Sequence, residues 1–149
     1  MEAFKIINFQ RENPGAAFPS WEALTADECT SFKERIAERM GLPRNIDPLV
    51  MVKKLSDLGV PQAGIGLDPS NDDLAKILQH IKIEPPKMVY INWYRFDNID
   101  KMAFGDLSRN LDSIWYPGPD DIDLFDETMN WILSLSHHGT FESVVFPMR

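Results

Sequence analysis

The sequence predicts an α+β fold in which a helical part, residues 1–86, packs on an antiparallel sheet of about four to five strands formed mainly by residues 87–149. Two observations predict it. Apolar residues recur at steps of three and four in the first part, and they alternate with polar residues after Pro85-Pro86. A length of 149 residues fits a single domain, 1–149, that can bury a core without disulfides. Because helices gather at one end of the chain, we expect them to cover one face of the sheet.

Three helices are expected in the first part, each with its own start signal. Thr25 and Glu28 have the S/T-x-x-E spacing of a capping box, which predicts a helix that ends near the next glycine. Asp47 before Pro48 is an N-cap and first-turn pair for a second helix, and a third begins near Ser70. The apolar stripes expected to face the core are Cys29, Phe32, Ile36 and Met40 in the first helix, Leu49, Val52, Leu55 and Leu58 in the second, and Leu74, Ile77, Leu78 and Ile81 in the third.

Most of the expected strands follow the double proline. Met88–Tyr94 is rich in β-branched and aromatic residues, which predicts a central strand. The helical spacing of Phe104–Ile114 predicts a short helix after it, and the last three strands are expected to form an antiparallel meander. The expected strands are residues 4–9, at an edge of the sheet, then 88–94, 121–124, 131–136 and 141–146.

The composition restricts the classes of partner. Fifteen basic and 23 acidic residues give a net charge of −8, which counts against direct contact with nucleic acid and favours a basic partner. No apolar run is long enough to span a bilayer or to form the core of a signal peptide, so we expect no membrane partner and no export. The single cysteine, Cys29, is expected to pack in the core and suits a reducing compartment. A cytoplasmic location is therefore expected.

Acidic and aromatic residues concentrate in one segment. Residues 97–127 hold nine acidic and two basic side chains, a net charge of −7, and all three tyrosines lie between residues 90 and 131. Trp93 and Trp131 lie in apolar runs and are expected in the core, whereas the Trp-Tyr pair beside a Pro-Gly-Pro turn is a candidate for the surface. Aromatic anchors with a charged rim are typical of protein interfaces, although a purely local role of the acids in caps and turns stays open. The expected partner-binding residues are Trp115, Tyr116, Asp120, Asp121, Asp123 and Asp126.

No motif in the chain names a reaction. Asp120–Asp123 has D-x-D spacing, which is common in acidic chains, and the sequence contains no EF-hand loop, nucleotide-binding glycine motif or G-x-S-x-G turn. A nuclease that pairs Pro-Asp with acid-x-Lys is excluded because no lysine follows Lys101. His137 and His138 are candidate metal ligands, but adjacent residues on a strand point to opposite faces. We therefore expect no catalytic residue, no metal ligand and no cofactor.

A resemblance to a known group of proteins covers residues 88–146. The segments that carry it are Phe104-Gly-Asp-Leu, Ile114-Trp-Tyr-Pro, Asp120-Asp-Ile-Asp-Leu-Phe-Asp126 and Trp131-Ile-Leu-Ser-Leu-Ser-His137-His-Gly139. They resemble segments of small acidic bacterial proteins that act as immunity partners in polymorphic toxin systems. The resemblance implies strands in these segments and an immunity role, but neither a particular toxin nor a binding surface.

Three functions are compatible with the sequence. The leading hypothesis is a non-enzymatic protein-binding module that neutralises a basic protein partner, expected to be a toxin nuclease domain. The alternative is a small metal-dependent hydrolase that uses the acids of Asp120–Asp126 together with His137. A third interpretation is a structural subunit of a homodimer. The salt dependence of association and titration with divalent cations distinguish the first two.

Overall fold

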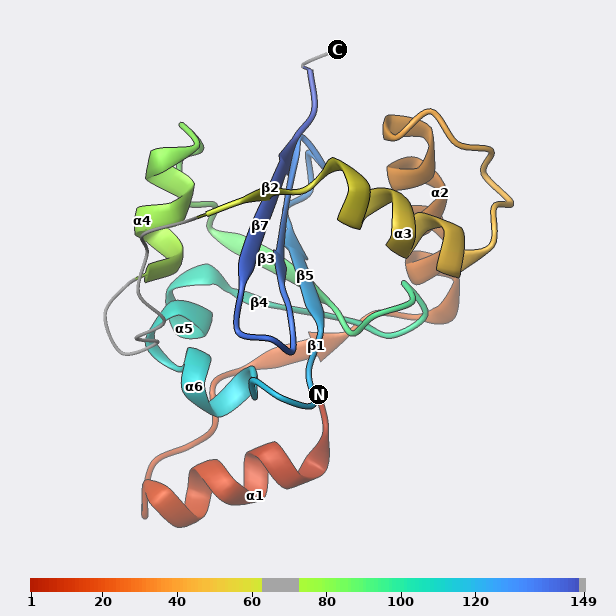
Figure 1. The fold of residues 1–149 in the computed structure, drawn as a ribbon. Helices are drawn as coiled ribbons and strands as arrows, with labels where there is room; N and C mark the ends of the chain where they lie inside the picture. Colours follow the sequence, from red (N-terminus) through yellow and green to blue (C-terminus); the bar gives the residue numbers. More distant parts are fainter. Residues whose placement is uncertain (63–72, 148–149) are drawn as a thin grey trace.

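The computed structural model describes residues 1–62 and 73–147 of the chain (Figure 1). These residues form an antiparallel sheet of seven strands with helices packed against it, so the predicted α+β class is confirmed, with more strands than expected. Within the same residues, no helix is both long and apolar enough to cross a membrane. The elements are α1 (Ala3–Glu12), β1 (Trp21–Ala23), α2 (Ala26–Arg39), α3 (Pro48–Leu58), β2 (Val60–Pro61), α4 (Asp73–His80), β3 (Met88–Asn92), β4 (Ile99–Ala103), α5 (Phe104–Arg109), α6 (Leu111–Ile114), β5 (Ile122–Phe125), β6 (Trp131–Leu135) and β7 (Phe141–Val145), and the strand order is β1-β4-β3-β5-β6-β7-β2.

Helices cover both faces of the sheet, not the single face that was expected (Figure 1). α2 and α3 pack on one face, and α4, α5 and α6 pack on the other. In β6, Ile132 belongs to the core under α2 and α3, whereas its neighbour Leu133 belongs to the core under the other helices. Successive side chains of a strand point to opposite faces, so a strand covered on both sides is apolar at successive positions, as β6 is from Trp131 to Leu133.

Three strands lie outside the predicted set. β1 and β2 are the two edge strands and are exposed along their whole length, so they lack the buried alternation that marks a strand in a sequence. β4 carries the buried Asp100 and the partly exposed Lys101 in its interior, which hide its strand character. The central strand β3 and the antiparallel meander of β5, β6 and β7 are confirmed.

The expected edge strand at residues 4–9 is wrong, because this segment belongs to helix α1. Lys5 and Phe9, one helical turn apart, are the buried residues of α1, whereas Phe4 and Ile7 are 43% and 54% exposed. At position 5, the side chain that points into the protein is thus that of a lysine. A lysine interrupts the apolar stripe that marks a helix, and the remaining apolar residues then resemble a strand.

Helix α2 begins with the predicted capping box. Thr25 Oγ1 accepts a hydrogen bond from the backbone N–H of Glu28 at 3.2 Å, and Glu28 Oε1 accepts one from the N–H of Thr25 at 3.0 Å. The expected start of the third helix, Ser70, lies outside the described residues. The buried residues of α2 are Cys29, Phe32, Ile36 and Ala37, and those of α4 include Leu74, Ile77 and Leu78.

Helix α3 begins where predicted but presents a narrower face to the core. The Asp47 carboxylate caps it by accepting the N–H of Leu49 at 2.8 Å. The helix buries Met51 and Leu55, while Leu49 and Leu58 of the expected stripe are 49% and 39% exposed. α3 contacts β7, which lies next to the edge strand β2.

We expect Thr25→Ala to lower the free energy of unfolding by about 1 kcal/mol, because the first turn of α2 loses the side chain that accepts one of its free N–H groups. Urea denaturation measures the change. Thr25→Ser keeps the hydroxyl and is the matched control, so a loss of equal size in both variants would contradict a capping role.

Candidate functional site

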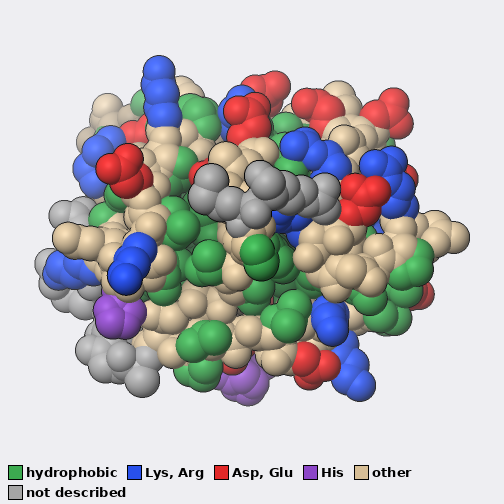
Figure 2. Space-filling view, turned by 90° about the horizontal axis from the view of Figure 1, so that it is seen from above, with side chains coloured by type: hydrophobic (Ala, Val, Ile, Leu, Met, Phe, Trp, Pro, Cys, Tyr) green, Lys and Arg blue, Asp and Glu red, His purple; other side chains and the backbone are tan. Residues whose placement is uncertain are grey.

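The acids of residues 97–127 are divided among several parts of the fold. Asp106 pairs with Arg109 on α5 at 2.6 Å. Asp126, at the turn after β5, accepts hydrogen bonds from both the N–H and the hydroxyl of Thr128. The face in Figure 2 carries acidic side chains interspersed with Lys and Arg. Asp106 and Asp126 are thus engaged by different partners at separate places in the fold.

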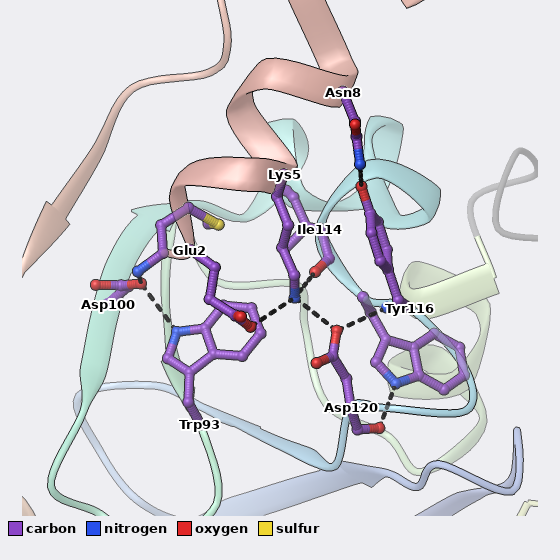
Figure 3. A network of polar contacts seen from close by, with 10 residues as sticks. Glu2, Lys5, Asn8, Trp93, Asp100, Ile114, Tyr116 and Asp120 are labelled. Carbon is purple, nitrogen blue, oxygen red and sulfur yellow. Dashed lines mark hydrogen bonds and ion pairs between the residues drawn. The ribbon is translucent and has the colours of Figure 1, made fainter.

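Asp120, an expected partner-binding residue, is engaged inside the protein (Figure 3). The Lys5 side chain of α1 is fully buried, and its Nζ donates to Asp120 Oδ2 at 2.5 Å and to the carbonyl of Ile114 at 2.7 Å. The same ammonium lies 4.1 Å from the centre of the Trp93 ring. The Asp120 carboxylate also accepts the N–H of Tyr116 at 2.9 Å. Asp120 thus joins α1 to the loop after α6 and is not presented to a partner.

The Trp-Tyr pair divides between the core and the boundary with α1. Trp115 is 2% exposed, its indole N–H donates to the carbonyl of Asp120 at 3.1 Å, and its ring packs on Phe141. Tyr116 is half-buried, with its ring 5.7 Å from that of Phe4 and its hydroxyl accepting a hydrogen bond from Asn8. Trp115 is therefore a core residue that cannot anchor a partner without unfolding of this loop.

Asp100, which the sequence did not single out, is the second acid held inside the fold. Its carboxylate pairs with the α-amino group of Met1 and accepts the indole N–H of Trp93 at 2.9 Å (Figure 3). Both inward-facing acids considered so far, Asp100 and Asp120, thus have a cation of this chain in contact. Neutralisation by a cation is the usual condition for burying a carboxylate.

Asp121 and Asp123 lie together in a pocket of about 290 Å³ beside α3. The pocket lies on the face of the sheet that α2 and α3 cover, with Val52, Leu55 and Ser56 of α3 among its lining residues. Its floor comes from β5, β6 and β7, and its walls come from α3, the loop after β3 and the turn after β6. The lining residues are Val52, Leu55, Ser56, Tyr94, Asp121, Ile122, Asp123, Ser134, Leu135, Ser136, His137, His138, Thr140 and Glu142.

A row of polar side chains crosses the strands at the floor of this pocket. The strand register pairs Asn92 with Asp123, Asp123 with Ser134, and Ser134 with Glu142. Paired residues project from the same face of a sheet, so the row is continuous from β3 to β7. The Asp123 carboxylate accepts the hydroxyl of Ser134 at 2.6 Å and the side-chain amide of Asn92 at 2.9 Å, while Asn92 Oδ1 accepts the N–H of Phe96 at 2.7 Å. Asp123 is therefore fixed in position.

Burial raises the pKa of Asp123 above its ordinary value. The hydrogen bonds from Ser134 and Asn92 favour the ionised form and oppose this effect, and the nearby charge of Asp121 adds to it. The ionised form of Asp123 is thus unfavourable in the protein when no partner is bound.

The pocket supplies no cation to Asp123. It is lined by three acids, Asp121, Asp123 and Glu142, and none of the described lining residues is Lys or Arg. Glu142 lies against the C-terminal end of α3, where a Cβ at Gly59 would be 2.6 Å from its Oε2. The last turn of α3 contains no basic residue, so its carbonyl groups add negative potential. In contrast to Asp100 and Asp120, Asp123 therefore has no Lys or Arg among the described residues that line its pocket.

An Asp-His pair forms the rim of the pocket. Asp121 Oδ1 lies 2.8 Å from His137 Nδ1 and accepts the backbone N–H of His137 at 2.7 Å. His137 and His138 lie in a turn after β6 with ring centres 3.9 Å apart, so the opposite orientation expected for strand neighbours does not apply. Among residues 1–62 and 73–147, no group of three or more His, Cys, Asp or Glu side chains is placed to hold a metal ion.

The sequence located two of the three pocket acids, Asp121 and Asp123, and missed the third, Glu142. Asn92 and Ser134 were not recognised as hydrogen-bond partners of Asp123, because each is an ordinary polar residue of a strand. The turn after β6 contained a usable signal, since the register of β6 and β7 is symmetric about His138 and counting outward from it pairs Ser134 with Glu142.

Comparison of the chain with protein-family models, with curated proteins and with solved structures gives no match. A function is therefore inferred from the pocket itself.

Proposed function

We propose that this protein is a non-enzymatic binding module of the immunity type that acts in the cytoplasm and neutralises a basic protein partner, a toxin nuclease domain. The observation that carries the proposal is the Asp123 carboxylate, held by hydrogen bonds at the floor of an acidic pocket without a cation of its own chain among the described residues. A basic partner supplies the missing charge. Nucleases fit this requirement because a surface that binds phosphate is rich in Lys and Arg.

The rim of the pocket adds an aromatic contact. Tyr94, in the loop after β3, is 38% exposed and lines the pocket. Its backbone has a φ of 102°, which is unfavourable for a residue other than glycine. Strain of this kind is retained where function requires it, and exposed tyrosine is a frequent anchor of protein interfaces. We therefore place the partner on Tyr94, Asp121, Asp123 and Glu142 rather than on Trp115 and Asp120.

The metal-dependent hydrolase is the second candidate, because Asp121, Asp123 and His137 line the same pocket. Its mechanism requires a ligand set for a divalent cation, and the described residues offer no group of three such side chains arranged around one point. Calorimetric titration with Mg²⁺, Mn²⁺ and Ca²⁺ tests it, since millimolar binding abolished by Asp123→Asn would favour the hydrolase over the binding module.

The binding proposal is tested with the protein encoded by the neighbouring gene. We expect the two proteins to elute as one complex in size exclusion, and the double variant Asp121→Asn/Asp123→Asn to slow association at low salt by about tenfold, because charge steering is lost. The matched control is Asp112→Asn, which removes one exposed charge on α6 outside the pocket. An unchanged association rate, or an equal loss in the control, would contradict this placement.

A further inference from the structure

We infer that the pocket beside α3 receives an arginine side chain of the basic partner. This inference rests on the proposed function and names the group that the pocket binds. It follows from the size of the pocket, from the arrangement of its acceptors and from its apolar wall.

The size fits one amino-acid side chain. Pockets for organic ligands typically measure about 300–1,000 Å³. At about 290 Å³, this pocket is just below that range, and it is open to solvent. A single long side chain that enters from a docked protein fits such a space better than a larger free ligand.

The acceptors favour a guanidinium over an ammonium. Asp123 and Glu142 project from β5 and β7 with β6 between them, so their backbones are about 9–10 Å apart. Each carboxylate oxygen of Asp123 accepts one hydrogen bond and has capacity for another. A guanidinium carries five N–H donors spread over a rigid plane and can donate to two separated carboxylates at once, whereas an ammonium is a compact charge.

The walls suit the rest of an arginine side chain. Val52 and Leu55 of α3 offer an apolar surface for its methylene groups. At the rim, Tyr94 presents an aromatic ring, and guanidinium groups stack on aromatic rings. The guanidinium of Arg95 already lies 5.4 Å from the centre of this ring, an example of that contact within the chain.

The test is an NMR titration of the protein with three capped amino acids: N-acetyl methylamides of arginine, of lysine and of citrulline, the uncharged analogue of arginine. We expect the arginine compound to shift the amide signals of Asp123, Ser134 and Glu142, and to bind on the order of fivefold more tightly than the lysine compound. The citrulline compound should leave these signals in place. Asp123→Asn and Glu142→Gln should each weaken arginine binding on the order of tenfold, with Asp112→Asn as the unchanged control.

The outcomes separate this inference from the proposed function. Equal binding of the lysine or citrulline compound, or no shift of the pocket signals at saturating arginine, would overturn the inference while complex formation with the partner could still stand. Arginine binding without any complex between the two proteins would instead overturn the proposed function. The spectra of the two pocket variants report directly whether they are folded.

Discussion

Replacing Lys5 with Met is expected to lower the free energy of unfolding by about 3–5 kcal/mol, the largest stability effect that we predict for a single substitution. Methionine fills a similar space, but it leaves the Asp120 carboxylate without its cation and the carbonyl of Ile114 without its donor. A buried charge that has lost its partner costs more than the pair contributes. Urea denaturation followed by circular dichroism measures the loss.

The double variant Lys5→Met/Asp120→Asn is the control for the Lys5 prediction. The asparagine side chain introduced in place of Asp120 would keep an oxygen for the N–H of Tyr116 and would not require a counter-ion. We therefore expect the double variant to regain a large part of the stability that Lys5→Met loses. If the loss in free energy of unfolding of the double variant equalled the sum of the losses of the two single variants, the two side chains would not be coupled.

Asp123→Asn is expected to raise the free energy of unfolding by roughly 0.5–2 kcal/mol at neutral pH while it weakens binding to the partner. Asparagine keeps both hydrogen bonds, because its oxygen can accept from Asn92 and its amide can donate to the hydroxyl of Ser134. It removes the charge that has no cation in the pocket. A gain in stability with a loss of binding is the signature of a residue kept for function.

The pH dependence of stability gives the sign of the Asp123 effect. The pKa of Asp123 is raised in the folded protein, so between its ordinary value of 3.8 and the raised value the folded state binds more protons than the unfolded state. The free energy of unfolding therefore decreases as pH rises through this window. Asp123→Asn has no carboxyl group at this position, so this decrease is absent from the variant. Asp121, Glu142, His137 and His138 also face the pocket, so the measured quantity is the difference between wild type and Asp123→Asn across about pH 3–8. If the difference in free energy of unfolding between wild type and Asp123→Asn did not change with pH, the pKa of Asp123 would not be raised.

Local signals in the sequence predicted α2, α3 and the meander well, because caps and apolar periodicity are short-range properties. The capping box of Thr25 and the strand that begins at Met88 are examples. The edge strands and α1 could not be predicted in this way. A two-residue strand such as β2 forms only by pairing with β7. Lys5 can be buried only because it pairs with Asp120, which is 115 positions away in the sequence.

The candidate site shows the same division between local and distant information. Charge and composition led to Asp121 and Asp123, which do line the pocket, but also to Trp115 and Asp120, which the fold uses internally. No property of Asp120 and Asp123, two acids three positions apart, distinguishes them in the sequence. The difference is a lysine on a distant helix that reaches one of them and not the other.

The position of the two edge strands has a consequence for biosynthesis. β1 and β2 come from the first 61 residues, whereas the five strands between them come from residues 88–145. During translation β1 and β2 leave the ribosome before β4 and β7, with which they pair, have been made. Pairing over such sequence separations closes long loops and is slow. The nascent chain must therefore wait for its last strand before the sheet is complete, and the pocket, whose floor includes β7, is assembled only at that final step.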